Sequence, residues 1–436
     1  MSSSTAPAPA PVPAPAPAMP ASPVAAARAT PFWLPAAHFA TGLVFLTAVA
    51  LLLPFAAADL AAGRFLQPRV VAATHLITLG WLTVSIMGAL CQLFTVVLGT
   101  PLRWIRLSAV TLALYAPGLA LFVTALLTGW ATLVIAGALM FSSALVLFLI
   151  NAIATLKRSK TRDLTWWSLA GAFFFLAATI TFGVSLAVNL QTSHLGYGRL
   201  GALFIHVHVA LGGWVLLTII AVARRLLPMF LLSHGADERA LRVAAWSMGG
   251  GAFVLTLFHR ALTRPLSLLA VALMTLAVIA LALQIAAYVR TRHRPQLDAG
   301  LRMVLAGAAL LLAGLVIGLT ALLRGGTGML AAYGVAMVGG LGLFVAGHYY
   351  KILPFLLWNH RFAPLVGKRT LPKISELYDA RLATVASFAS IAGMLGLLLG
   401  SLLHVAAVAI GAAVLLACGF VIEAGQLFKL LRTKVA

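Results

Sequence analysis

Apolar runs long enough to span a membrane recur along almost the whole chain, separated by short polar segments. About 20 consecutive apolar residues suffice to cross a bilayer as an α-helix. Because several runs are only a few residues apart, neighbouring helices must run antiparallel. The pattern predicts an all-α polytopic membrane bundle of about twelve transmembrane helices. The expected spans are 36–57, 71–98, 107–127, 130–156, 165–190, 200–224, 240–258, 266–289, 301–323, 328–357, 381–402 and 405–430.

The N-terminal stretch differs in composition from the rest. Residues 1–34 are rich in Ala and Pro, with Ser at the start, and contain no long apolar run. Such a composition is typical of a disordered, polyproline-like segment. We expect a disordered cytoplasmic tail over 1–34 and a single transmembrane domain over 35–436.

Composition excludes an ordinary soluble globule, since 62% of the 436 residues are hydrophobic and only 9% are charged. The formal net charge of +22 would suggest nucleic-acid binding in a soluble chain. Here the basic residues lie in short loops between apolar spans. They therefore indicate membrane topology and contact with anionic lipid headgroups, and no nucleic-acid partner.

The basic residues are distributed unequally between the two membrane faces. Only six of the 30 Lys and Arg residues fall on the side opposite the N-terminal tail, which leaves 24 on the tail's side. Under the positive-inside rule both termini then lie in the cytoplasm, with the chain in a bacterial inner membrane. The six on the outer side are Arg64, Arg69, Arg199, Arg260, Arg264 and Arg324.

Two spans share a sequence pattern. His75, Gly80, Trp81, Ile86 and Leu93 of the second span recur as His208, Gly213, Trp214, Ile219 and Leu226 of the sixth, each 133 positions later. Five identities at one offset without a gap predict two parallel helices that each present a histidine at the same depth. Both histidines begin helices that enter from the outer face.

The sixth span carries a second histidine, His206. Residues two apart on an α-helix are separated by about 200° around its axis, so His206 and His208 point in nearly opposite directions and cannot grip one site together. Histidine within a membrane span is rare and usually functional, although one near a helix end is also readily solvated by headgroups. Together with His75, these residues make three histidines at one depth, which favours ligation of a cofactor or metal.

Further candidates lie at the same outer level. Gly80 and Gly213 would let a flat macrocycle lie against the backbone, although helix–helix packing explains small residues equally well. His259 ends the seventh span beside Arg260 and Arg264. Their guanidinium groups suit the carboxylates of haem propionates, and the competing interpretation is ordinary loop charge.

His348 stands apart from this group. If Lys351–Pro354 is aligned with Arg225–Pro228, His348 lies about 20 Å deeper than His208, on the inner side. We expect it to serve another site or to be structural.

Acidic residues are scarce within the spans. Seven of the eight lie in loops, and Glu423 alone lies inside a span, near its inner end. A proton pump or ion-coupled carrier normally has carboxylates at mid-membrane. The chain also lacks a phosphate-binding loop and an HExxH zinc motif, and neither Cys91 nor Cys418 indicates a disulfide framework.

The segments HLITLGWLTVSIMGALCQLFTVVLG and HVHVALGGW, within a twelve-span plan, resemble the heme-copper oxidase superfamily of terminal oxidases and nitric oxide reductases. The resemblance implies three arcs of four helices, in the manner of the oxidase membrane subunit. It also implies that His75 and His208 sandwich one haem b and that His206 faces a second haem or copper. A haem with two imidazole ligands transfers electrons and has no open coordination position.

The chain departs from that family in ways that affect its activity. It has no His-His dipeptide for the copper site, its His-x-His lies on the sixth span and not the tenth, and the membrane carboxylates are missing. Nitric-oxide-response membrane proteins, which also have twelve spans and bind haem, are a nearer type of relative. We expect a haem protein of oxidase-like fold that transfers electrons or senses a diatomic gas such as NO or O2.

The alternative is a cofactor-free transporter or assembly scaffold whose histidines line an outer vestibule. Expected partners are membrane lipid and an electron-donor protein or a quinol. A homo- or hetero-oligomer is also compatible with the small-residue face of Gly396 and Gly400.

Overall fold

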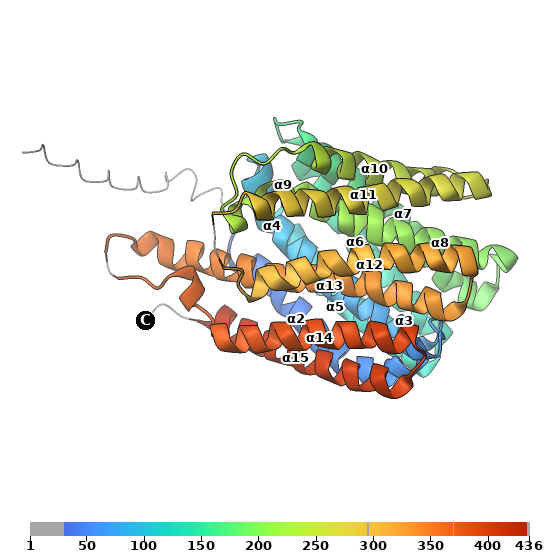
Figure 1. Cartoon of the computed structure of the whole chain (residues 1–436). Coiled ribbons are helices and arrows are strands. Elements are labelled where there is room, and N and C mark those ends of the chain that lie inside the picture. Colours follow the sequence, from blue (N-terminus) through green and yellow to red (C-terminus); the bar gives the residue numbers. More distant parts are fainter. Residues whose placement is uncertain (1–29, 294–295, 369, 434–436) are drawn as a thin grey trace, which may run out of the picture.

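The computed structural model describes residues 30–293, 296–368 and 370–433, and within them twelve helical segments are long and apolar enough to cross a membrane. They lie side by side along one axis (Figure 1). The predicted all-α bundle is therefore confirmed. The expected tail lies outside the described residues up to residue 29, and the first helix begins at Trp33. The helices are α2 (Trp33–Ala61), α3 (Pro68–His75), η1 (Leu76–Thr83), α4 (Val84–Leu98), α5 (Ile105–Thr128), α6 (Ala131–Lys157), α7 (Leu164–Thr192), η2 (Gly196–Gly198), α8 (Arg199–His208), η3 (Val209–Leu216), α9 (Leu217–Leu231), α10 (Arg239–Leu257), α11 (Arg264–Arg290), α12 (Ala299–Arg324), α13 (Thr327–Leu357), η4 (Trp358–Phe362), η5 (Ala363–Leu365), η6 (Ile374–Glu376), α14 (Ala380–Leu402) and α15 (Ala406–Arg432).

The scarce acidic residues mark helix starts. Asp163, Asp298 and Asp379 are the N-caps of α7, α12 and α14, and each side chain accepts a hydrogen bond from a backbone N–H of the first turn. An N-cap carboxylate satisfies an orphan donor and also complements the helix dipole. These carboxylates cap the first turns of three spans that begin at the same end of the bundle. That end is called the inner face below, after the predicted orientation, and the opposite end the outer face.

Three spans occupy the middle of the bundle: α3–η1–α4, α8–η3–α9 and α13. In the 18-residue apolar stretch of each of these spans, 89%, 56% and 72% of the residues are buried, in that order. The corresponding shares in the other nine spans are 33 to 56%. They are the second, sixth and tenth spans, so one of every four helices is central, as three arcs of four helices require. All three run in the same direction, from the outer to the inner face.

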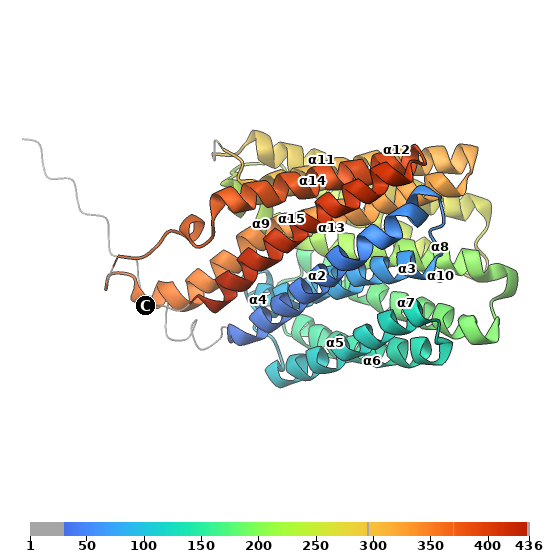
Figure 2. The ribbon, with the colours of Figure 1, turned by 90° about the horizontal axis from the view of Figure 1, so that it is seen from below.

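The remaining helices form a surrounding layer of antiparallel pairs. The pairs α5–α6, α10–α11 and α14–α15 pack closely, α12 packs against the central α13, and α15 lies along α2, so the last span meets the first (Figure 2). Close approach depends on small residues. A Cβ on Gly137 of α6 would lie 2.5 Å from the backbone nitrogen of Phe122 on α5, so only glycine fits there.

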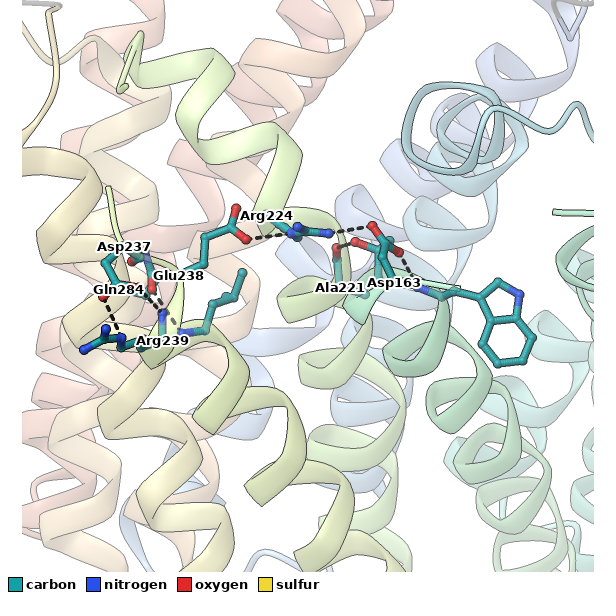
Figure 3. Close-up of polar contacts among 10 residues, drawn as sticks. Asp163, Ala221, Arg224, Asp237, Glu238, Arg239 and Gln284 are labelled. Carbon is teal, nitrogen blue, oxygen red and sulfur yellow. Dashed lines mark hydrogen bonds and ion pairs between the residues drawn. The ribbon is translucent and has the colours of Figure 1, made fainter. Parts of the chain in front are cut away.

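An ion-pair network ties three helices together at the inner face. Arg224 of α9 lies 2.5 Å from a carboxylate oxygen of Asp163 and 2.8 Å from one of Glu238, which precede α7 and α10 (Figure 3). The hydroxyl of Thr165 donates to the Ala221 carbonyl beside it, at 3.2 Å. These contacts let the helix of the sixth span continue to Leu231, seven residues beyond the predicted end at 224.

Candidate functional site

The sequence repeat of the second and sixth spans is also a structural repeat. These two central helices change from α to π geometry directly after His75 and His208, at Leu76–Thr83 and at Val209–Leu216. Both ends of the second π segment lie 133 residues after those of the first, which is the sequence offset. π segments are rare and often mark functional sites. The histidines therefore occupy equivalent places in two copies of one local structure.

His75 and His208 are held in the same tautomer. The Nδ1 of His75 lies 2.8 Å from the Val71 carbonyl, and the Nδ1 of His208 lies 2.8 Å from the Phe204 carbonyl. A carbonyl only accepts, so Nδ1 carries the proton and the lone pair of each neutral ring is on Nε2. This is the arrangement in which a histidine presents Nε2 to a metal while a backbone carbonyl fixes its orientation.

His208 faces α13. Its Nε2 accepts a hydrogen bond from the Tyr333 hydroxyl at 3.1 Å, and the two rings lie 5.9 Å apart with an angle of 21° between their planes. Tyr333 was not among the residues that the sequence singled out. A lone tyrosine in an apolar span gives no pattern, so only its place opposite His208 distinguishes it.

His206 faces the opposite neighbour, α7. A Cβ on Gly183 would lie 3.0 Å from its Cε1, so the ring packs directly against the backbone of that helix. Its Nδ1 is buried and forms no hydrogen bond of good geometry among the described residues, although the Thr179 backbone of α7 lies nearby. Because His206 and His208 leave the helix toward different neighbours, their expected opposed directions are observed.

The three histidines have different described neighbours. His75 and His206 are near enough to interact electrostatically, and the His75 ring also lies edge-on to Phe122 of α5, at 5.1 Å. His208 lies instead against Tyr333. The pairing of His75 with His208 stays a prediction.

The other outer candidates have mixed surroundings. Gly80 and Gly213 are covered by equivalent aromatic rings, since a Cβ would lie 2.8 Å from Phe45 and 2.7 Å from Phe175. The side of each helix next to these glycines is filled by the preceding span, which corresponds to the helix-packing alternative.

His259 is exposed at the outer face, and its ring lies 5.4 Å from Phe182, next in the chain to the Gly183 that backs His206. Arg260 and Arg264 are exposed nearby in the chain. Among the described residues, no three His, Cys, Asp or Glu side chains lie together so as to hold a metal ion.

A cavity lies between the three central helices, on the inner side of the histidines. Each helix lines it with residues at five equivalent positions, and the offsets between the copies are 133 and 126. The second offset is also that of the Lys351–Pro354 and Arg225–Pro228 segments, so that alignment holds in the structure. The empty volume is about 580 Å³ including its open mouth. The lining residues are Ser85, Ile86, Ala89, Leu90 and Leu93; Thr218, Ile219, Val222, Ala223 and Leu226; Phe344, Val345, His348, Tyr349 and Ile352; and Phe39 of α2.

His348 belongs to this cavity and not to the outer site. It lies 15 residues after Tyr333 on the same helix, which is about 22 Å along the axis. Its Nδ1 lies 2.8 Å from the Phe344 carbonyl. The equivalent positions on the other two helices are Ala89 and Val222, so this polar group is on one wall alone.

Comparison with known proteins identifies the fold of this chain. No protein-family model matches the sequence, and no curated protein matches it. Among solved structures, a heme-copper terminal oxidase described as a dimer by cryo-electron microscopy matches with a TM-score of 0.67 and 15% sequence identity, over 92% of this chain and 85% of that chain. The chain therefore has the twelve-helix fold of a heme-copper oxidase membrane subunit.

Proposed function

We propose that this chain is a haem-binding protein of the bacterial inner membrane that transfers electrons. The observation that carries the proposal is the set of three histidines at one outer level, two of which occupy equivalent places in the repeated unit of histidine and π segment. Each unit supplies an imidazole at the same outer depth. The oxidase-like fold supports this interpretation.

The donor set at the outer level fits a b-type haem. His75 has its Nδ1 proton engaged by a carbonyl, which leaves Nε2 as the ligating atom. His206 has a buried Nδ1 that forms no hydrogen bond of good geometry among the described residues, and a buried nitrogen of this kind costs about 1–3 kcal/mol unless something binds it. We infer that His75 and His206 are the two ligands, because each has a ring nitrogen without a described hydrogen bond and the two residues are near enough to interact electrostatically, whereas both ring nitrogens of His208 are hydrogen-bonded.

His208 then has a separate task. Its Nε2 already accepts from Tyr333, so His208 and Tyr333 together form the polar contact between α8 and α13. Should a second haem or a copper ion be present, this is where we place its ligand.

A haem between two imidazoles supplies one-electron transfer without an open position for a gas. For this reason we favour electron transfer over direct sensing of NO or O2. The residues of this chain orient the imidazoles through the Val71 carbonyl and the Gly183 backbone, and Phe122 packs against the His75 ring. A quinol or an electron-donor protein would supply the electron.

Absorption spectroscopy of the purified protein tests the assignment. We expect a reduced-minus-oxidised spectrum with a b-type α band that is unchanged by carbon monoxide. His75→Ala and His206→Ala should each remove the band, and His208→Ala should retain it. Retention in His206→Ala together with loss in His208→Ala would restore the pairing of His75 with His208. A band that shifts with carbon monoxide would favour gas sensing.

The competing function, a cofactor-free transporter or scaffold, predicts a colourless protein. Purified protein without haem, from cells that supply haem to a co-expressed b-type cytochrome, would overturn the proposal. Copper analysis of the same preparation tests the second site, since a copper-to-protein ratio near zero excludes a copper centre.

A further inference from the structure

Glu423 of α15 is a carboxylic acid inside the bundle that the proposed haem site does not use. It is fully buried, and neither carboxylate oxygen has a hydrogen-bond partner among the described residues. Burying an unpaired charge is expensive in a protein interior and more so in a membrane. An ionisable group retained in such a place needs an explanation.

Other buried polar atoms without described partners lie around the same stretch of α15. The Trp81 ring lies 5.6 Å from the ring of Phe420, and its Nε1 is buried and forms no hydrogen bond of good geometry among the described residues, although Tyr349 lies beside it. The hydroxyl of Ser390 lies against Gly419, one turn before Glu423, and it too has no partner. The Tyr350 hydroxyl, which interacts electrostatically with Glu423, is the third. Three polar groups thus lie near the stretch of α15 from Gly419 to Glu423, and none of them forms a described hydrogen bond with the carboxylate.

This cluster connects toward the inner face. The Tyr350 ring lies 5.3 Å from that of Tyr378. Tyr378 lines a polar cleft between the start of α12 and the start of α14, together with Asp298, Arg302 and Thr384. That cleft lies among the N-caps of two inner helix ends, so its contents exchange with the inner aqueous phase.

The same cluster connects toward the central cavity. Tyr349, which also interacts electrostatically with Glu423, has its hydroxyl 2.6 Å from that of Ser85. Both residues line the cavity. Tyr378, Tyr350, Glu423, Tyr349 and Ser85 are thus successive neighbours from the inner cleft to the cavity, and water molecules between their oxygen atoms would complete the connection.

We propose that Glu423 is a proton-binding site that exchanges protons between the inner-face cleft and the central cavity. A proton passes from water in the cleft to the Glu423 carboxylate by way of the Tyr378 and Tyr350 hydroxyls. It leaves by way of the Tyr349 and Ser85 hydroxyls. Each transfer breaks one O–H bond and forms another, so every hydroxyl ends with the proton number it began with. The route needs no oxidant and stands without a haem.

The donor chemistry favours a proton over a metal cation. An indole N–H cannot ligate a cation, and Glu423 is the one carboxylate among the groups named in this cluster, whereas hydroxyl groups can both accept and donate a proton. The helices packed against α15 carry these titratable groups: Tyr333, His348, Tyr349, Tyr350 and Lys351 on α13, His38 and Asp59 on α2, and Arg381 on α14. Lys351 is ion-paired with Asp298 and the Nδ1 of His38 lies 2.9 Å from the Leu34 carbonyl, so the cluster contains no described counter-cation for Glu423.

Labelling with dicyclohexylcarbodiimide tests whether Glu423 holds a proton. This apolar reagent adds to protonated carboxyl groups, and the other acidic residues lie at helix ends and in loops. In nanodiscs we expect one adduct, mapped by mass spectrometry to Glu423, whose yield falls as the pH is raised. Glu423→Gln has the same shape but no carboxyl group, so this variant should give no adduct. If Glu423 stays unlabelled from mildly acidic to mildly alkaline pH, and the infrared measurement also detects no protonated carboxyl group, the proposal is overturned.

Infrared spectroscopy tests both the proton and its route. A protonated Glu423 gives a carboxylic C=O band that is lost in Glu423→Gln and shifts on transfer to D2O. Tyr350→Phe should slow that shift. Tyr288→Phe is the matched control, because Tyr288 is another buried tyrosine whose hydroxyl has no described partner, on the distant α11. The absence of a band removed by Glu423→Gln contradicts the site, and equal rates in the two tyrosine variants contradict the route.

Discussion

Arg224 shows how a single residue changes the interpretation of a span. From the sequence, two adjacent arginines indicate the end of a membrane helix. In the structure Arg224 joins Asp163 and Glu238, and its side chain is 23% exposed. A guanidinium group suits two carboxylates because it presents several donors in fixed directions.

We predict that Arg224→Ala lowers the stability of the inner end of the bundle. Two partly buried carboxylates would lose their partner, and the expected loss is about 2 kcal/mol, between the effects of exposed and buried pairs. Thermal unfolding in detergent measures it. Arg239→Ala is the matched control in the same network (Figure 3), because its pair with Asp237 is 83% and 61% exposed and contributes little. Equal effects of the two variants would contradict the prediction.

At the same scale, sequence reasoning found part of the candidate site. His75, His206 and His208 were predictable because histidine is rare in an apolar span and because two of them repeat. Their partners were not, since Tyr333, Gly183 and Phe122 are ordinary residues of membrane helices. Which ring faces which neighbour depends on helix rotation in the bundle, and no pattern within one helix records it.

The elements were predicted better than the contacts. Twelve spans follow from hydropathy alone, and most ends agree within a few residues. The tenth span is an exception, because π and 3-10 turns extend it from 357 to Leu365, with the Trp358 indole donating to the Pro372 carbonyl at 2.9 Å. The π segments were also not predicted, since their residues have no special propensity and only the backbone shows the change.

The α14–α15 pair accounts for the small-residue face at Gly396 and Gly400. Added Cβ atoms would lie 2.8 Å from the Cβ of Ala412 and 2.6 Å from the nitrogen of Ala409. Both contacts are within the chain, so this face serves helix pairing and leaves no evidence there for an oligomer.

We predict opposite effects for two Gly→Ala substitutions in this pair. Gly400→Ala forces α14 away from α15 and should destabilise the protein by about 1–3 kcal/mol. Gly411→Ala has nothing within 4 Å of the new atom, and alanine favours the helix by about 0.5–1 kcal/mol. Melting temperatures of the two variants in one detergent provide the comparison. A Gly400→Ala protein as stable as the wild type would show that the two helices separate easily.

For the whole molecule, the positive-inside rule supplies an orientation that the fold alone does not. The outer arginines Arg64 and Arg69 are both ion-paired with Asp59, which leaves little net positive charge at that turn. The inner face keeps most of the basic residues. The expected arrangement is that the end carrying the C-terminus faces the cytoplasm.

Cysteine labelling tests that orientation. In a background without Cys91 and Cys418, we expect Tyr197→Cys to react with a membrane-impermeant maleimide in intact spheroplasts. Thr161→Cys, at the other end of the bundle, should react only after permeabilisation. Both positions are exposed, so access and not burial decides the result. The reverse pattern would invert the topology and place the histidines near the cytoplasm.

The three matching walls of the central cavity have a consequence for how such a protein can change. A symmetric trimer must accept any substitution three times over, once in each subunit. Here the three copies are joined in one polypeptide, so an imidazole can be introduced on one side while the facing sides keep alanine and valine. Having three equivalent walls in one polypeptide therefore lets each side of the cavity change independently, which separate identical subunits cannot achieve.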